Sequence, residues 1–189
     1  MEDVTRDPAW IDDATILVTS NVDKAILTAC AASHFAKRQN QLLFRWKRKL
    51  RLELPAGVDA IVYDEDANPE LFAYFVAGAP ANILDNNSGN VGWGVANGSP
   101  CRLHSLGWDD DTKRQAVLEL VDGARSAGLH VVNLPFPPEY INVQLLDSNK
   151  DPLPASQWPP DVNLAVGDPT SNAGVVIPIG LMSANNRKR

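Results

Sequence analysis

The chain has 189 residues, 44% of them hydrophobic and 21% charged, and its formal net charge is −6. This composition can fill the core of one globular domain and excludes wholesale disorder, while two cysteines are too few for a secreted disulfide scaffold. The acidic N-terminus lacks the apolar core of a signal peptide, and no run reaches the ~18 apolar residues of a membrane span. We therefore expect an intracellular protein, nuclear or cytoplasmic, that is not secreted and has no membrane partner.

The first predicted element is a strand followed by a capped helix. Residues 14–19 (ATILVT) are apolar and β-branched, which is typical of a buried strand, and residues 1–13 form an N-terminal extension. Ser20 and Asn21 supply N-cap chemistry, and the Ala-rich stretch from Asp23 to Arg38 predicts a helix with basic residues in its last turn. Residues 14–40 thus have the pattern of the opening of an α/β unit.

Positive charge is concentrated where this helix ends. Between Lys37 and Arg51 there are seven cations and no acid, so the rest of the chain carries 10 cations and 23 acids. The net charge is therefore the sum of +7 in this window and −13 elsewhere. Because salt screens charges over roughly 8 Å under physiological conditions, a local patch can attract an anion despite repulsion from more distant acids.

Within this window the residues from Phe44 to Leu54 alternate in polarity. Apolar side chains take the even positions and cations the odd ones (Arg45, Lys47, Lys49 and Arg51), with Arg48 as the exception. A period of two predicts a strand with one apolar and one basic face, on which cations repeat every ~6.6 Å, close enough to follow an extended polynucleotide. The same pattern suits a solvent-facing or edge strand, where cations prevent aggregation between sheets. Both interpretations stay open.

Residues 41–146 are predicted to be rich in β-structure. Strands are expected at 81–84 and 101–106, and Asn97–Gly98 between them is a strong tight-turn signal. The turn-rich stretch over 85–98 and its flanking strands indicate a small β-barrel or meander. The three acids from Asp109 to Asp111 are interpreted as the N-terminus of a helix over 112–127, in preference to a cation site.

The C-terminal part is predicted to return to strands. We expect them at 129–133 and 140–146, on either side of the turn from Pro135 to Pro138, and at 174–179. Residues 147–173 are proline-rich and predict a loop, and residues 174–189 combine the last strand with a basic tail.

The sequence lacks the motifs from which catalytic sites are built. No glycine is followed by lysine, so there is no phosphate-binding P-loop, and the glycines from Gly89 to Gly98 do not open a helix. The three histidines have no partner at metal-ligand spacing, and no nucleophile motif is recognisable. We therefore expect no catalytic residue, no metal site and no cofactor bound by this chain alone.

Three passages carry a family resemblance. They are residues 16–23 (ILVTSNVD), residues 75–87 with 94–106 (FVAGAPANILDNN and GVANGSPCRLHSL), and residues 134–143 with 175–179 (LPFPPEYINV and VVIPI). In this order they resemble the C-terminal half of superfamily-one ATP-dependent DNA helicases of the RecD-like, petite-integration-frequency type. The resemblance spans residues 14–180, and the Asn-Gly-Ser passage is its most specific part.

The resemblance implies an α/β fold, a partial RecA-like domain with an inserted small β-barrel over residues 41–146. It implies that Thr19, Ser20 and Asn21 lie beside the ATP cleft, and that Asn97 belongs to a barrel turn near the path of single-stranded DNA, with Asn86 in the preceding loop. ATP and Mg are ligands of the family. Because the P-loop and the acidic metal-binding motif are missing here, we expect no ATP hydrolysis by this chain alone.

Two hypotheses of function follow. The first is a helicase-derived accessory module that contacts single-stranded DNA or RNA without catalysis, through the residues Arg45, Lys47, Lys49, Arg51, Trp46, Trp93 and Asn97. For the two tryptophans a core role is favoured over base stacking, because Trp46 lies on the apolar face and Trp93 in a glycine-rich turn. The second is a non-catalytic scaffold domain that binds another protein, such as the remaining helicase domains, on the proline-rich surface over 135–160. An unrelated enzyme with a new site is the least supported alternative.

Overall fold

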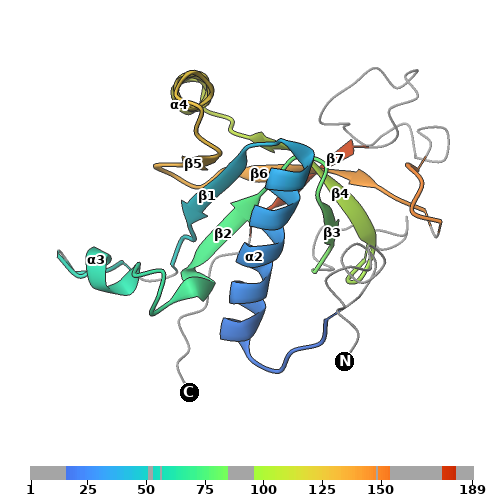
Figure 1. The fold of residues 1–189 in the computed structure, drawn as a ribbon, viewed down its shortest axis with the longest axis horizontal. Helices are drawn as coiled ribbons and strands as arrows, with labels where there is room; N and C mark the ends of the chain where they lie inside the picture. Colours follow the sequence, from blue (N-terminus) through green and yellow to red (C-terminus); the bar gives the residue numbers. More distant parts are fainter. Residues whose placement is uncertain are drawn as a thin grey trace.

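The computed structural model describes residues 16–50, 53–55, 57–84, 96–147, 149–153 and 176–181. The described residues form a mixed α/β structure (Figure 1), which confirms the α/β part of the predicted fold class. In chain order, the elements are α2 (Asn21–Gln39), β1 (Leu43–Lys47), α3 (Asp59–Val62), the 3-10 helix η2 (Pro69–Leu71), β2 (Phe72–Phe75), β3 (Pro80–Asn82), β4 (Pro100–Gly107), α4 (Asp111–Ser126), β5 (Val131–Asn133), β6 (Tyr140–Leu145) and β7 (Val176–Gly180).

The strands form two sheets, and the chain passes from the first to the second, back to the first and again to the second. A three-stranded sheet has the order β2-β1-β5, with β1 antiparallel to β2 and parallel to β5. A four-stranded sheet has the order β3-β4-β6-β7 and is antiparallel throughout. Among the described residues this second sheet is open, because its outer strands β3 and β7 do not pair with each other. The predicted barrel is therefore not closed by these strands.

β1 is the central strand of the three-stranded sheet, and its two faces are covered by different helices. Phe44 and Trp46 face the cluster that includes α4, whereas Leu43 on the other face packs against Ala36 of α2. In Figure 1, α2 crosses one side of the sheet and α4 lies away from α2. The interpretation of this segment as an edge strand is therefore wrong. β1 is also shorter than the predicted strand over 44–54, because it ends at Lys47.

The largest hydrophobic cluster joins the three-stranded sheet to α4. Trp46 and Trp108 are each only 3% exposed in this cluster. The Trp108 ring meets Phe136 edge-on at 6.3 Å between centroids, and its Nε1–H donates to the carbonyl of Pro137 over 3.2 Å. A buried indole needs such an acceptor. The cluster consists of Trp46, Phe75, Trp108, Val117, Ala124, Val132 and Leu134.

Both long helices begin and end with the predicted signals. Ser20 caps α2 by accepting hydrogen bonds from the backbone of Val22 and Asp23, as expected for this side chain. Asp110 caps α4, and Gly128 follows that helix with φ of +66°, a conformation that glycine adopts without a steric penalty. The predictions of helices over 23–38 and 112–127 are confirmed.

Most of the predicted strands after residue 80 are confirmed as β3 to β7, but the first predicted strand is not. Ala14 and Thr15 lie outside the described residues, and residues 16–19 form no strand. Leu17 is 91% exposed. β-propensity mainly reflects packing against neighbouring strands, and no described strand pairs with this segment.

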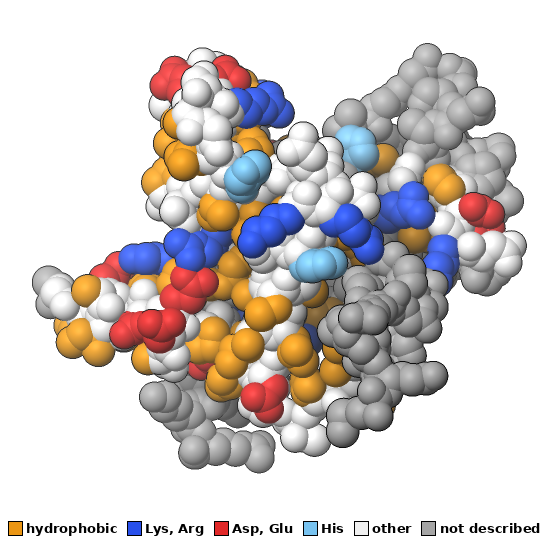
Figure 2. Space-filling view, in the orientation of Figure 1, with side chains coloured by type: hydrophobic (Ala, Val, Ile, Leu, Met, Phe, Trp, Pro, Cys, Tyr) orange, Lys and Arg blue, Asp and Glu red, His pale blue; other side chains and the backbone are white. Residues whose placement is uncertain are grey.

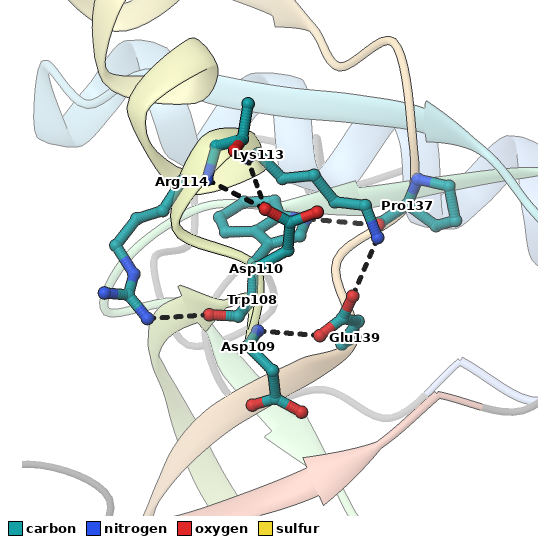
Figure 3. Close-up of polar contacts among 8 residues, drawn as sticks. Trp108, Asp109, Asp110, Lys113, Arg114, Pro137 and Glu139 are labelled. Carbon is teal, nitrogen blue, oxygen red and sulfur yellow. Dashed lines mark hydrogen bonds and ion pairs between the residues drawn. The ribbon is translucent and has the colours of Figure 1, made fainter.

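A polar network holds the corner between β4 and α4 against the start of β6 (Figure 3). The carboxylate of Glu139 accepts from the backbone N–H of Asp109 over 2.7 Å and pairs with the Lys113 ammonium over 2.8 Å. The hydrogen bond from Lys113 lowers the pKa of Glu139, and the backbone N–H of Thr112 lowers the pKa of Asp110. The contacts of Glu139 thus hold the corner at its surface, and the buried Trp108 ring holds it from the core side.

We predict that Trp46→Ala destabilises the protein by about 3–5 kcal/mol, because it leaves a large cavity under α4. Urea unfolding followed by circular dichroism measures this change. Leu17→Ala, at an exposed position, is the matched control and should change stability by less than about 0.5 kcal/mol. A loss below about 1 kcal/mol for Trp46→Ala would show that this residue is not central to the core.

We also predict a pH effect from the corner. A carboxylate whose folded pKa is lowered adds stability above its unfolded pKa and loses it as the pH falls through the folded value. Unfolding midpoints should therefore decline less steeply between roughly pH 5 and pH 3 in Glu139→Gln than in the unmodified protein. Parallel curves for the two proteins would contradict this role of Glu139.

Candidate nucleic-acid interface

Only part of the predicted basic face exists on β1. Arg45 and Lys47 point to the same face as Leu43, with Arg45 half-buried and Lys47 exposed. Lys49 lies beyond the end of the strand, and Arg51 lies outside the described residues. The described cations therefore do not form an unbroken row along one strand.

Arg45 is held by partners on two sides. Its Nε–H donates to Oδ1 of Asn133 on β5 over 2.8 Å, and its Nη1 forms an ion pair with Glu65. The guanidinium also lies over the ring of Phe72, 5.8 Å from its centroid. A phosphate would have to displace Glu65 to reach these donors. Arg45 is thus mainly a structural residue that joins β1, β5 and the segment before β2.

Glu65 is fixed by a second hydrogen bond. Its Oε1 accepts from the Tyr74 hydroxyl over 2.7 Å, and Tyr74 lies opposite Arg45 on the neighbouring strand. Burial raises the pKa of Tyr74 well above its usual value, and the hydrogen bond to Glu65 raises it further. The phenol therefore stays protonated and can serve as a donor. Arg45, Glu65 and Tyr74 form one connected group on this face of the sheet.

Arg48, the exception in the alternation, ties down the same segment. Its backbone N–H donates to the carbonyl of Leu71 over 2.8 Å, and its side chain donates to the carbonyl of Glu70 over 3.2 Å. The Tyr63 hydroxyl donates to the carbonyl of Arg48 over 2.8 Å. The acid-rich segment over 59–71 thus folds back along the basic window and pairs with it.

Two lysines remain accessible at the end of β1. The Lys47 side chain is 53% exposed, with its Nζ 4.0 Å from an Asp59 carboxylate oxygen and 4.8 Å from the centre of the Tyr63 ring. Lys49 is exposed and has no ion pair within the described part of the chain. In Figure 2, blue and red side chains lie next to each other at the end of β1 that is nearest to α3. An ion pair as exposed as that of Lys47 with Asp59 holds the lysine only weakly.

Both lysines line an open hollow of about 660 Å³. Its walls also carry two acids, Glu53 and Asp59, so the four charged side chains cancel formally. Tyr63 contributes an aromatic wall, although its ring is half-buried and already faces Lys47. The full lining consists of Lys47, Lys49, Leu50, Glu53, Leu54, Asp59, Tyr63 and Pro137.

The remaining predicted nucleic-acid contacts fall in different places. Trp46 is buried in the core, so the proposal that it stacks on bases is wrong and the favoured core role is confirmed. Trp93 and Asn86 lie outside the described residues. Asn97 is exposed in the confirmed tight turn before β4, where Gly98 has φ of +95° and donates to the carbonyl of Ile83. This turn belongs to the four-stranded sheet, whereas the lysines follow the three-stranded one.

The residues expected beside an ATP cleft lie at the N-terminus of α2. The hydroxyl of Ser20 is engaged in capping α2, and Thr19 and Asn21 are exposed beside it. Across the described residues, no three His, Cys, Asp or Glu side chains are grouped so that they could hold a metal ion.

Sequence reasoning missed the acids that pair with the basic window. Glu65 and Asp59 follow that window by fewer than 25 positions, in a segment where five acids lie between Asp59 and Glu70. A basic run followed closely by an acidic one is a signal for mutual pairing, because opposite charges attract over short range. That signal was available in the charge pattern, but the predicted interface counted the cations alone.

Comparisons with protein-family models, curated proteins and solved structures give no match for this chain. Its likeness to helicases therefore rests on the three sequence passages. Among the described residues, none of the helices is both long and apolar enough to cross a bilayer.

We predict that Glu65→Ala lowers stability by about 1 kcal/mol, since it removes the carboxylate that pairs with Arg45 and accepts from Tyr74 at a partly exposed site. Chemical unfolding measures this loss, and Asp66→Ala, an exposed acid beside it, is the control. In a double-mutant cycle with Arg45→Met, the two losses should not add. Additive losses would contradict the pairing.

Proposed function

We propose that the chain is a non-catalytic accessory module, a partial RecA-like domain of helicase origin, that contacts single-stranded DNA or RNA. The observation that supports this most is the pair of exposed lysines, Lys47 and Lys49, on the wall of one open hollow. The three sequence passages support the helicase origin. ATP and Mg belong to the proposed ancestry and not to the action of this chain.

The contact expected from this geometry is weak. Arg45 is bound by Glu65 and Asn133, and Arg51 lies outside the described residues, so the contact is proposed for the two described lysines. The acids Glu53 and Asp59 in the same hollow reduce the local positive potential. Binding should therefore depend on phosphate contacts without base preference, and it should be easily reversed by salt.

A second candidate, a scaffold domain that binds another protein, is favoured by a different observation. Apolar side chains are exposed just before α2 and along its first turns, including Ile16, Leu17 and Ile26. Exposed apolar surface of this kind is typical of contacts between proteins. The proline-rich surface predicted over 135–160 is less suitable at its start, because Pro138 is buried and Phe136 packs on Trp108. Residues 154–160 lie outside the described part.

The test is a fluorescence anisotropy titration of a labelled, ~20-nucleotide oligothymidine at low salt. We predict that the double reversal K47E/K49E weakens binding by about tenfold or more, because attraction to phosphate becomes repulsion. The matched control is R102E/R125E, which changes the net charge equally at two exposed arginines that lie outside the hollow.

The outcomes separate the two candidates. A selective loss in K47E/K49E supports the lysine contact. An equal loss in both double variants would show that only the overall charge matters, and the proposed site would be wrong. No binding by the unmodified protein at low salt would overturn the nucleic-acid function and leave the scaffold domain.

A further inference from the structure

The outer face of α2 has no partner among the described residues. Ala36 is buried and Ala32 and Phe35 pack beside it against the sheets, so the helix is anchored along one side only. On the other side Ile26 is 47% exposed and Leu27 is 39% exposed. Figure 2 shows this helix across the front of the molecule, with apolar side chains gathered over its N-terminal half.

Charges of opposite sign mark the two ends of this face. Asp23 lies in the first turn of α2 and Lys37 in the last, and neither has an ion pair within the described residues. Figure 2 shows an acidic side chain near the N-terminal end of the helix and basic and histidine side chains toward its C-terminal end. Both charged residues are solvent-exposed and therefore available to a partner.

The face is symmetric about Cys30, which is exposed. Asp23 and Lys37 are each seven positions from Cys30, and Ile26 and His34 are each four positions from it. Residues at spacings of three, four and seven share one face of a helix, and seven residues span about 10 Å. The charged ends are thus equally far from the centre and opposite in sign.

We propose that this face (Asp23, Ile26, Leu27, Cys30, His34 and Lys37) binds the same face of a second copy of the chain. The two helices lie antiparallel around a twofold axis at Cys30. Asp23 of each copy then meets Lys37 of the other, and Ile26 and Leu27 of each copy cover the region around His34 of the other. A twofold contact needs such a self-complementary surface.

Charge complementarity selects this occupant and its orientation. A parallel pair would place Asp23 beside Asp23 and Lys37 beside Lys37, which is repulsive at both ends. A unipolar partner such as nucleic acid would be attracted to Lys37 and repelled by Asp23. An antiparallel copy satisfies both ends at once. Because one helix face is a small surface, the dimer is reversible and its formation depends on concentration.

The first experiment is sedimentation equilibrium of the full chain over a range of concentrations. Each single reversal, Asp23→Lys or Lys37→Glu, should weaken dimerisation on the order of tenfold, and the double reversal should restore it. The matched control is Lys24→Glu, on the same helix but outside the face, which should leave dimerisation unchanged. Rescue by the double variant separates loss of pairing from loss of folding.

The second experiment uses Cys30 as a reporter of the axis. Mild oxidation should yield a disulfide-linked dimer, because facing helices at the axis bring the two Cα atoms within bonding range and Cys101 is buried. Cys30→Ser should abolish this product, and Asp23→Lys should reduce it strongly. The proposal would be overturned by a protein that stays monomeric at all concentrations. It would also be overturned by a dimer whose dissociation constant does not change in the charge-reversal variants. Neither result depends on whether the chain binds nucleic acid.

Discussion

The position of β1 in the middle of the three-stranded sheet is the constraint on which the rest of the structure depends. A central strand is covered on both faces, so Trp46 enters the core under α4 while Leu43 packs against α2. Arg45 is then held beside two neighbouring strands and only partly reaches solvent. Removing a charge from water is costly unless it is paired, and Glu65 and Asn133 supply the partners. The segment that carries Glu65 must therefore fold back along β1.

This pairing changes what the basic window can do. Seven cations without an acid suggest a track for a polyanion, yet the strand places one of them in an internal ion pair and uses another, Arg48, to anchor the chain before β2. Charge counted along the sequence therefore overestimates charge presented to a ligand. Lys47 and Lys49 are the part of the window that the fold leaves open at the hollow.

Local signals in the sequence predicted local structure well. Ser20 and Asp110 cap the helices as their side chains suggest, and Asn97–Gly98 forms the expected turn, because these outcomes depend on neighbouring residues. Sequence periodicity also found the alternation of Arg45 with Trp46. It could not show that β1 pairs in parallel with β5 or that Arg45 bonds Asn133, 88 positions away, since such contacts depend on the whole fold. For the same reason residues 16–19, strand-like by composition, do not pair with any strand among the described residues.

The salt dependence of oligonucleotide binding tests the central claim most directly, because it counts the phosphates that are engaged. For single strands the slope of log affinity against log salt is about −0.7 per contact, so the two lysines predict a slope near −1.4. A slope near −3 would require about four contacts, which is more than these two lysines can supply. That result, or affinity that does not change with salt, would contradict a contact made by Lys47 and Lys49 alone.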